Sequence, residues 1–255
     1  MTPVRDAAQR RIIVALDVDS LREARRMVRM LAPHVQCFKV GKQLFVHAGP
    51  DVVRLIHASG RDVFLDLKFH DIPNTVAKAV IEAARLGVRL VDLHASGGPA
   101  MMAAARTEVT RVCRREGLRR PLLLAVTVLT SLDDADLRAV GVGSGAARQV
   151  LRLARLAARS GMDGVVCSPR EIATIRRALG RRFTIVTPGV RPPGAAVGDQ
   201  KRVLAPGEAV AAGADYLVLG RPILQATDPA AAVRAIAADI RAGARRRSAE
   251  ARIRE

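Results

Sequence analysis

Two carboxylates and one ammonium group are concentrated where a short apolar run ends. Asp66 and Lys68 directly follow the run 63–65, Asp71 comes three residues later, and Pro73 favours a turn there. If the run is a buried strand, Asp66 and Lys68 point to the same face, because strand side chains alternate. Burying such charges is costly unless they pair. Carboxylates that keep a lysine charged would let it stabilise a developing negative charge or donate a proton.

A solvent-facing salt bridge is the simpler interpretation of an isolated Asp-x-Lys pattern. Polar residues recur, however, at the ends of other apolar segments. They are Asp17, Lys39, Thr130, Pro188-Gly189 and Gly220-Arg221. This regularity favours one shared site over a surface ion pair, and it requires a fold that brings these segment ends together.

Eight apolar segments alternate with helical segments along the chain. The expected strands are 11–17, 37–41, 63–65 with the charged stretch after it, 90–98, 121–130, 164–168, 183–190 and 216–221. The expected helices are 21–31, 51–58, 75–86, 99–116, 145–160, 171–179, 208–212 and 229–242. The strands are continuously apolar, which is typical of a parallel sheet covered by helices, and no G-x-G-x-x-G follows the first strand. The sequence therefore predicts an α/β fold, a (β/α)8 TIM barrel in one domain, whose chemistry lies at the carboxyl ends of its strands.

Local signals predict where some of these units begin and end. Ser20 is expected to cap the helix 21–31, and Asn74 to cap the helix 75–86.

We predict one catalytic domain over residues 1–243. The remaining residues, 244–255, contain three consecutive arginines and are predicted to be a basic, frayed tail.

The composition restricts the partners and the compartment. The net charge of +18 would suit a polyanion, but the chain has only five Phe, one Tyr and no Trp to stack on bases, so we expect no specific nucleic-acid partner. Three widely spaced cysteines predict neither a disulfide framework nor a zinc site, and they fit a reducing cytoplasm. The polar first eleven residues and the short apolar runs predict no signal peptide and no membrane span.

The motif blocks resemble those of one enzyme family. The stretch 66–75, Asp-Leu-Lys-Phe-His-Asp-Ile-Pro-Asn-Thr, is similar to the long and specific signature of the orotidine 5′-phosphate decarboxylases. The resemblance covers nearly the whole chain. The other similar blocks, in order, are Asp17, Lys39, 94–98, 129–131, 188–191, 199–202 and Gly220-Arg221.

The resemblance implies an activity and a set of residue roles. The activity is decarboxylation of orotidine 5′-phosphate to UMP and CO2 in de novo pyrimidine biosynthesis, by a homodimer that uses no cofactor and no metal. Lys39, Asp66, Lys68 and Asp71 would form an alternating charged tetrad, in which Asp71 serves the neighbouring subunit and Lys68 protonates C6. The implied substrate-binding residues are Asp17 and Lys39 at the ribose, Asn74, Thr75 reaching across the dimer, Thr130 near the base, Pro188, and Arg191, Gln200, Gly220 and Arg221 at the 5′-phosphate, under a closing loop 191–201.

The chemistry of this reaction agrees with those roles. Loss of CO2 from C6 leaves an electron pair in the plane of the ring, where the π system cannot delocalise it. The chain carries no cofactor motif that would supply an electron sink. Stabilisation must then come from a preorganised cation such as Lys68, and contacts to the remote phosphate can drive loop closure.

Two other interpretations remain at this point. Enzymes resembling hexulose-6-phosphate synthase or keto-gulonate-phosphate decarboxylase share the barrel and the D-x-K-x-x-D pattern, but they stabilise an enediolate with Mg²⁺, for which the fourth expected strand offers Asp92 and His94. The stretch 72–75 and the loop 191–202 favour the pyrimidine enzyme instead. A catalytically inactive barrel that binds polyanions is the second alternative, and the intact set of charged residues argues against it.

Overall fold

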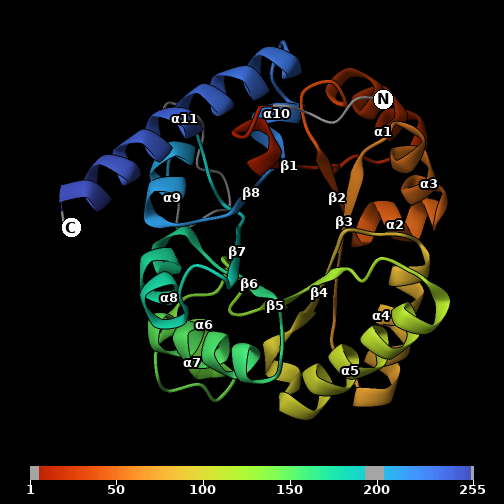
Figure 1. Cartoon of the computed structure of the whole chain (residues 1–255), viewed down its shortest axis with the longest axis vertical. Coiled ribbons are helices and arrows are strands. Elements are labelled where there is room, and N and C mark those ends of the chain that lie inside the picture. Colours follow the sequence, from red (N-terminus) through yellow and green to blue (C-terminus); the bar gives the residue numbers. More distant parts are fainter. Residues whose placement is uncertain (1–5, 193–203, 254–255) are drawn as a thin grey trace.

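A closed barrel of parallel strands organises the molecule, with helices around its outside (Figure 1). This computed structural model describes residues 6–192 and 204–253, with side chains up to residue 245. Each strand pairs with its neighbours in the chain, and β1 closes the barrel against β8, with Ile12 opposite Leu217. The strands of the described residues are β1 Ile12–Ala15, β2 Cys37–Gly41, β3 Asp62–Phe69, β4 Leu90–His94, β5 Leu122–Val126, β6 Gly164–Val166, β7 Thr184–Thr187 and β8 Tyr216–Leu219. The (β/α)8 barrel predicted from the sequence is therefore confirmed.

The helices cover the barrel between successive strands. They are α1 Leu21–Leu31, α2 Lys42–Ala48, α3 Asp51–Ala58, α4 Pro73–Arg85, α5 Pro99–Glu116, α6 Asp134–Ala139, α7 Ala146–Arg159, α8 Ile172–Leu179, α9 Pro206–Ala212, α10 Arg221–Leu224 and α11 Pro229–Ile253. Short 3-10 helices are η1 Gln9–Arg11, η2 Ala95–Gly97 and η3 Pro169–Glu171. None of the helices in the described part of the chain is long and apolar enough to cross a membrane.

The side chains of the strands divide the core into two layers. In β1, Ile12 and Val14 face the helices, whereas Ile13 and Ala15 face the barrel interior. The interior cluster, called the inner core here, consists of Ile13, Ala15, Cys37, Phe64, Leu90, Leu124, Val126, Val166, Val186 and Val218, with Leu122 and Tyr216 packed against it. Because every strand is covered on both faces, continuous apolar runs were required.

Several helix boundaries follow from local chemistry. The Ser20 hydroxyl accepts a hydrogen bond from the Glu23 amide at 3.2 Å, which confirms the predicted cap of α1. The cap predicted at Asn74 is wrong, whereas the expected turn is present as a bend at Asp71, between β3 and α4. Helix α4 already begins at Pro73, with Ile72 as its N-cap residue and no side-chain cap. Proline is favoured in the first helical turn because its fixed φ suits a helix and its missing N–H is not needed there.

Most expected strands are shorter in the structure, whereas one is longer. The fifth ends at Val126, not at residue 130. Strand β3 instead continues to Phe69, so the charged stretch belongs to the sheet. Helix α11 runs on to Ile253, well past the expected end at residue 242. Whether residues 244–255 act as a separate tail stays a prediction.

Candidate active site

Four charged side chains, three on β2 and β3 and one just after β1, form a chain of ion pairs at the carboxyl end of the barrel. Lys39 of β2 lies between two carboxylates, with its Nζ 3.2 Å from Asp17 Oδ1 and 3.2 Å from Asp66 Oδ2. The other oxygen of Asp66 pairs with Lys68 Nζ. Lys39 and Asp66 are only 9% and 8% exposed. Burial makes each charge dependent on its partners, so the chain Asp17–Lys39–Asp66–Lys68 is held together as one unit.

The pKa values of Asp66 and Lys39 favour the ionised form of both groups. Burial disfavours the charged form of Asp66, but Lys39 and Lys68 outweigh it and hold the pKa of Asp66 below its ordinary value. Burial likewise disfavours the Lys39 ammonium, but Asp66 and Asp17 raise the pKa of Lys39 above its ordinary value. At neutral pH, an ionised Lys39 therefore lies beside an ionised Asp66.

An irregularity in β3 places the Lys68 side chain. Leu65 pairs with Val91 of β4, and Phe69 pairs with Leu93, so β3 has extra residues between these two pairs. Lys68 sits in this bulge with a φ of 52°, and it is the one non-glycine residue in the described chain with a positive φ. Its backbone N–H donates to Asp92 Oδ1 at 2.9 Å. Asp66 and Lys68 are in contact, as expected, but through a bulge and not through regular alternation.

A cavity of ≈ 280 Å³ opens beside this network. Five residues expected at the site line it together: Lys39, Asp66, Lys68, Thr130 and Pro188. Leu129 and Ser131, from the block 129–131 noted in the sequence, also line it. The other walls are apolar and were not singled out from the sequence, because they are ordinary core residues: Phe64, Val126, Val128, Val166, Cys167 and Val218. A small apolar chamber with lysines on one wall suits a planar anionic ligand of modest size.

The remaining expected residues lie around this cavity, not in its wall. Asp17 does not line the cavity, but it is ion-paired with Lys39, which does. Gly220 closely approaches the Asp17 carboxylate, because a Cβ built on Gly220 would lie 3.1 Å from Asp17 Oδ2. Arg191 is half-buried, and its Nη1 donates to the Val190 carbonyl at 3.0 Å. Arg221 begins α10 and is exposed. Gln200 and most of the expected loop fall outside the described residues.

Asp71, Asn74 and Thr75 are exposed on this single chain. Asp71 Oδ1 accepts a hydrogen bond from the Ile72 amide at 2.6 Å, and no ion pair among the described residues joins Asp71 to Lys68. Ile72, between them, is 65% exposed although it is apolar. The structure of one chain thus completes only part of the expected tetrad, namely Lys39, Asp66 and Lys68.

Two histidines pack at the edge of the site. The His70 and His94 rings have centroids 5.4 Å apart, and they are tilted relative to each other. Burial, together with the nearby His70 and Lys68, lowers the pKa of His94 to about 4. His94 is therefore a neutral imidazole at physiological pH.

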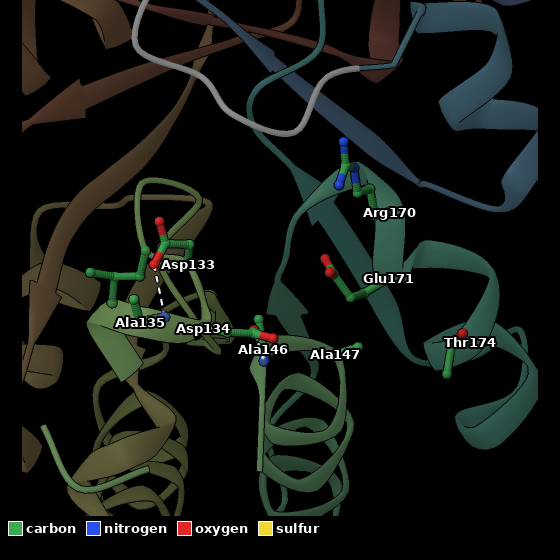
Figure 2. Close-up of a pocket in the computed structure, with 9 residues that line it drawn as sticks. Asp133, Asp134, Ala135, Ala146, Ala147, Arg170, Glu171 and Thr174 are labelled. Carbon is green, nitrogen blue, oxygen red and sulfur yellow. Dashed lines mark hydrogen bonds between the residues drawn. The ribbon is translucent and has the colours of Figure 1, made fainter. Parts of the chain in front are cut away.

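A larger cavity of ≈ 630 Å³ lies elsewhere, between α6, the start of α7 and α8 (Figure 2). Its acidic residues have structural partners. Asp133 caps α6 through the Ala135 and Asp136 amides, and Asp134 accepts from the Ala146 amide at 2.8 Å. Because these carboxylates hold helix ends, the smaller cavity at the strand ends is the better candidate for chemistry.

The described residues contain no group of three or more His, Cys, Asp or Glu side chains arranged to hold a metal ion. Asp92, considered from the sequence only for a metal site together with His94, is 1% exposed. One of its oxygens is already engaged by the Lys68 amide. The geometry at β4 is therefore that of an internal hydrogen-bonding group.

Comparison with known proteins gives a consistent result over nearly the whole chain. The family model described as Orotidine 5'-phosphate decarboxylase / HUMPS family matches residues 10–236. An orotidine 5'-phosphate decarboxylase from Syntrophotalea carbinolica is 55% identical over 92% of this chain and 96% of its own length. One from Geotalea daltonii is 53% identical over 94% of this chain and 99% of its own. The crystal structure of orotidine 5'-phosphate decarboxylase from Lactobacillus acidophilus superposes with a TM-score of 0.79 at 39% identity, over 90% of this chain and 98% of that one.

Proposed function

The chain belongs to the orotidine 5′-phosphate decarboxylase / HUMPS family, and from that membership we propose that it converts orotidine 5′-phosphate to UMP and CO2 without a cofactor. Family membership and the curated relatives support a carboxy-lyase of pyrimidine biosynthesis. The observation that carries the mechanism is the ion-paired chain Asp17–Lys39–Asp66–Lys68 beside an apolar cavity.

In the proposed mechanism, Lys68 stabilises the reaction electrostatically. Departure of CO2 develops negative charge at C6, in an orbital that the ring cannot delocalise. The Lys68 ammonium, fixed by Asp66, would face this charge and then transfer its proton to C6. Lys39 offsets the negative charge of Asp66. Asp66 can therefore hold Lys68 in place without cancelling the positive charge that Lys68 presents to the substrate. The apolar walls limit water, which strengthens each of these interactions.

The rest of the substrate has candidate binding groups around the cavity. Thr130 and Pro188 line it, and we assign them to the base. Asp17 and Lys39 supply a carboxylate and an ammonium for ribose hydroxyls. For the 5′-phosphate we propose Gly220, Arg221, Arg191 and Gln200, the last of which lies outside the described residues. Phosphate sites after the last strands of a (β/α)8 barrel are common, which agrees with this placement.

We further propose a homodimer whose partner completes each site. Asp71 and Thr75 would reach the neighbouring cavity, with Asn74 beside them. The support is that this stretch is exposed around the apolar Ile72, which is more typical of an interface than of a solvent-facing loop. Within the described chain, Asp71 has no ion pair that would give it another role.

The proposed function is tested by following the ultraviolet absorbance of orotidine 5′-phosphate with purified protein and excess EDTA. We expect rapid loss of the orotate chromophore with the unchanged protein and none with Lys68→Ala. Arg29→Ala removes an exposed charge on α1, far from the cavity, and should keep the wild-type rate. Circular dichroism of all three proteins verifies that the fold survives.

Each alternative outcome identifies a different error. Turnover by a folded Lys68→Ala protein would show that Lys68 is not the acid. No turnover by the unchanged protein, together with Mg²⁺-dependent reaction of hexulose phosphates, would favour the sugar-phosphate enzymes of the same family. Salt-sensitive polyanion binding without any turnover would favour an inactive binding barrel.

A further inference from the structure

Asp92 is a buried carboxyl group that the proposed mechanism does not use. It lies in the middle of β4 and is 1% exposed. Its Oδ1 accepts the backbone N–H of Lys68 at 2.9 Å. The bulge in β3 has removed this N–H from the regular ladder between Leu65 and Phe69, so Asp92 takes the place of a strand carbonyl.

The second oxygen of Asp92 is in an unusual position. Oδ2 is buried and receives no hydrogen bond from a donor in the described structure. The group within hydrogen-bonding reach of the Asp92 side chain is the Asp66 carboxylate. Two carboxylates are both acceptors, so they repel unless a proton lies between them. Asp66 already pairs with Lys39 and Lys68, which keeps it ionised, and the proton must then reside on Asp92.

We propose that Asp92 is a positioning residue that stays protonated and holds both members of the Lys68–Asp66 pair. Its Oδ1 accepts from the Lys68 backbone and fixes the left-handed conformation there, while its hydroxyl donates to Asp66. The charged groups that face it are Asp66 and Lys68 of β3, and His94 on its own strand is neutral. Burial, and then the Asp66 charge, raise the pKa of Asp92 well above its ordinary value, in agreement with this geometry.

An ionised Asp92 would damage the site in a specific way. It would compete with Asp66 for the Lys68 ammonium and would repel Asp66 from its position. A neutral acid avoids both effects, and it resembles an asparagine amide, because each group accepts through one atom and donates through the other. This equivalence makes Asp92→Asn the informative substitution.

The kinetic test rests on the proposed decarboxylation and compares Asp92→Asn with Asp92→Ala. We expect Asp92→Asn to keep kcat within about threefold, because both hydrogen bonds survive. Asp92→Ala should lower kcat about 10²-fold with little change in KM, because Lys68 is misplaced while the substrate contacts remain. Equal losses in the two variants, or a loss confined to KM, would overturn the positioning role.

A second test does not depend on activity. Infrared spectroscopy should detect the C=O stretch of a protonated carboxylic acid in the unchanged protein near pH 7 and lose it in Asp92→Asn. A spectrum with no such difference would overturn the protonated state. If the unchanged protein failed to decarboxylate orotidine 5′-phosphate, the proposed function would fail while this readout still decided the state of Asp92.

The pH dependence of stability gives a third readout, with Asp163 as the matched control. Asp163 also accepts a backbone N–H, from Leu123 at 2.8 Å, but it is ion-paired with Arg120 and its pKa is held below the ordinary value despite burial. Raising the pH above about 4 deprotonates Asp92 only in the unfolded chain. The unchanged protein should therefore lose stability relative to Asp92→Asn as the pH rises from about 4 to 8. Relative to Asp163→Asn it should instead gain stability as the pH rises to about 4, because the pKa of Asp163 is lowered by folding. The same sign for both variants would overturn the proposal.

Discussion

Lys68 combines a proposed chemical role with an unfavourable backbone conformation. Its φ of 52° is one that residues with a Cβ rarely adopt, at a cost of about 1–2 kcal/mol. The hydrogen bond to Asp92 and the ion pair to Asp66 hold it there from both ends. Strain of this kind persists only where the surroundings enforce it, and it is concentrated at functional sites.

The strain at Lys68 can be measured with a pair of substitutions that both remove the ammonium. Lys68→Gly should be about 1 kcal/mol more stable than Lys68→Ala, because glycine tolerates positive φ. The control is Lys78, which is exposed within α4, where Lys78→Gly should be about 1 kcal/mol less stable than Lys78→Ala. Urea unfolding of the four proteins gives both differences. A lower stability of Lys68→Gly than of Lys68→Ala would show that the backbone there is unstrained.

The sequence grouped the side chains of the proposed site better than it described their support. Lys39, Asp66, Lys68, Thr130 and Pro188 could be grouped because polar residues at strand ends converge on one rim of a barrel. The bulge at Lys68 could not be predicted, because it depends on how β3 pairs with β4. The internal role of Asp92 was missed for the same reason, since a lone aspartate in an apolar strand gives no sign of its partners.

At the scale of elements, strong periodicity predicted boundaries well, and short elements were missed. Helices α1, α3 and α5 have the expected ends, because each has a clear apolar face or a terminating glycine. Helices α2, α6 and α10 have seven residues or fewer, too few for a periodic pattern to be distinguished from a loop. The start of α4 was misplaced because Asn74 suggested a cap, although Pro73 could itself begin a helix.

The packing of α11 on α9 depends on a glycine contact. A Cβ built on Gly243 would lie 1.9 Å from the Gly207 carbonyl oxygen, which is backbone and cannot rotate away. Gly243→Ala should therefore destabilise the protein by about 1–3 kcal/mol, in spite of alanine's better helix propensity. Gly143→Ala is the control, because its Cβ would meet nothing within 4 Å. Thermal unfolding of the two variants measures the difference, and equal stabilities would mean that the helices separate without cost.

At the scale of the whole molecule, closure of the barrel brings residues from distant parts of the chain to one rim. Lys39 and Asp66 lie within β2 and β3, and Thr130 and Pro188 follow β5 and β7, yet all four line one cavity. Asp71 and Thr75 belong to the same motif but remain outside it on this chain. A second copy that contributes these residues would explain why they are exposed, and it would make assembly a condition of activity.

Mixing two inactive variants tests this shared site. Lys68→Ala and Asp71→Ala proteins, combined under conditions that exchange subunits, should recover up to about one quarter of the wild-type rate, because half of the dimers are mixed and each has one intact site. Exchange is verified with differently tagged subunits and native mass spectrometry. A mixture of Lys68→Ala and Asp66→Ala, whose residues share one chain's site, should recover nothing. Proven exchange without recovery in the first mixture would place Asp71 in its own subunit's site.

The inner core has a consequence for optical spectroscopy. The chain has no tryptophan and one tyrosine, Tyr216, which begins β8 and packs against the inner core at the end of the barrel opposite the cavity. The intrinsic fluorescence of the protein therefore comes from one fluorophore in the barrel interior. The intensity of this emission should change when the barrel unfolds, in every variant described above. It should change little when a nucleotide binds in the cavity at the opposite end of the barrel.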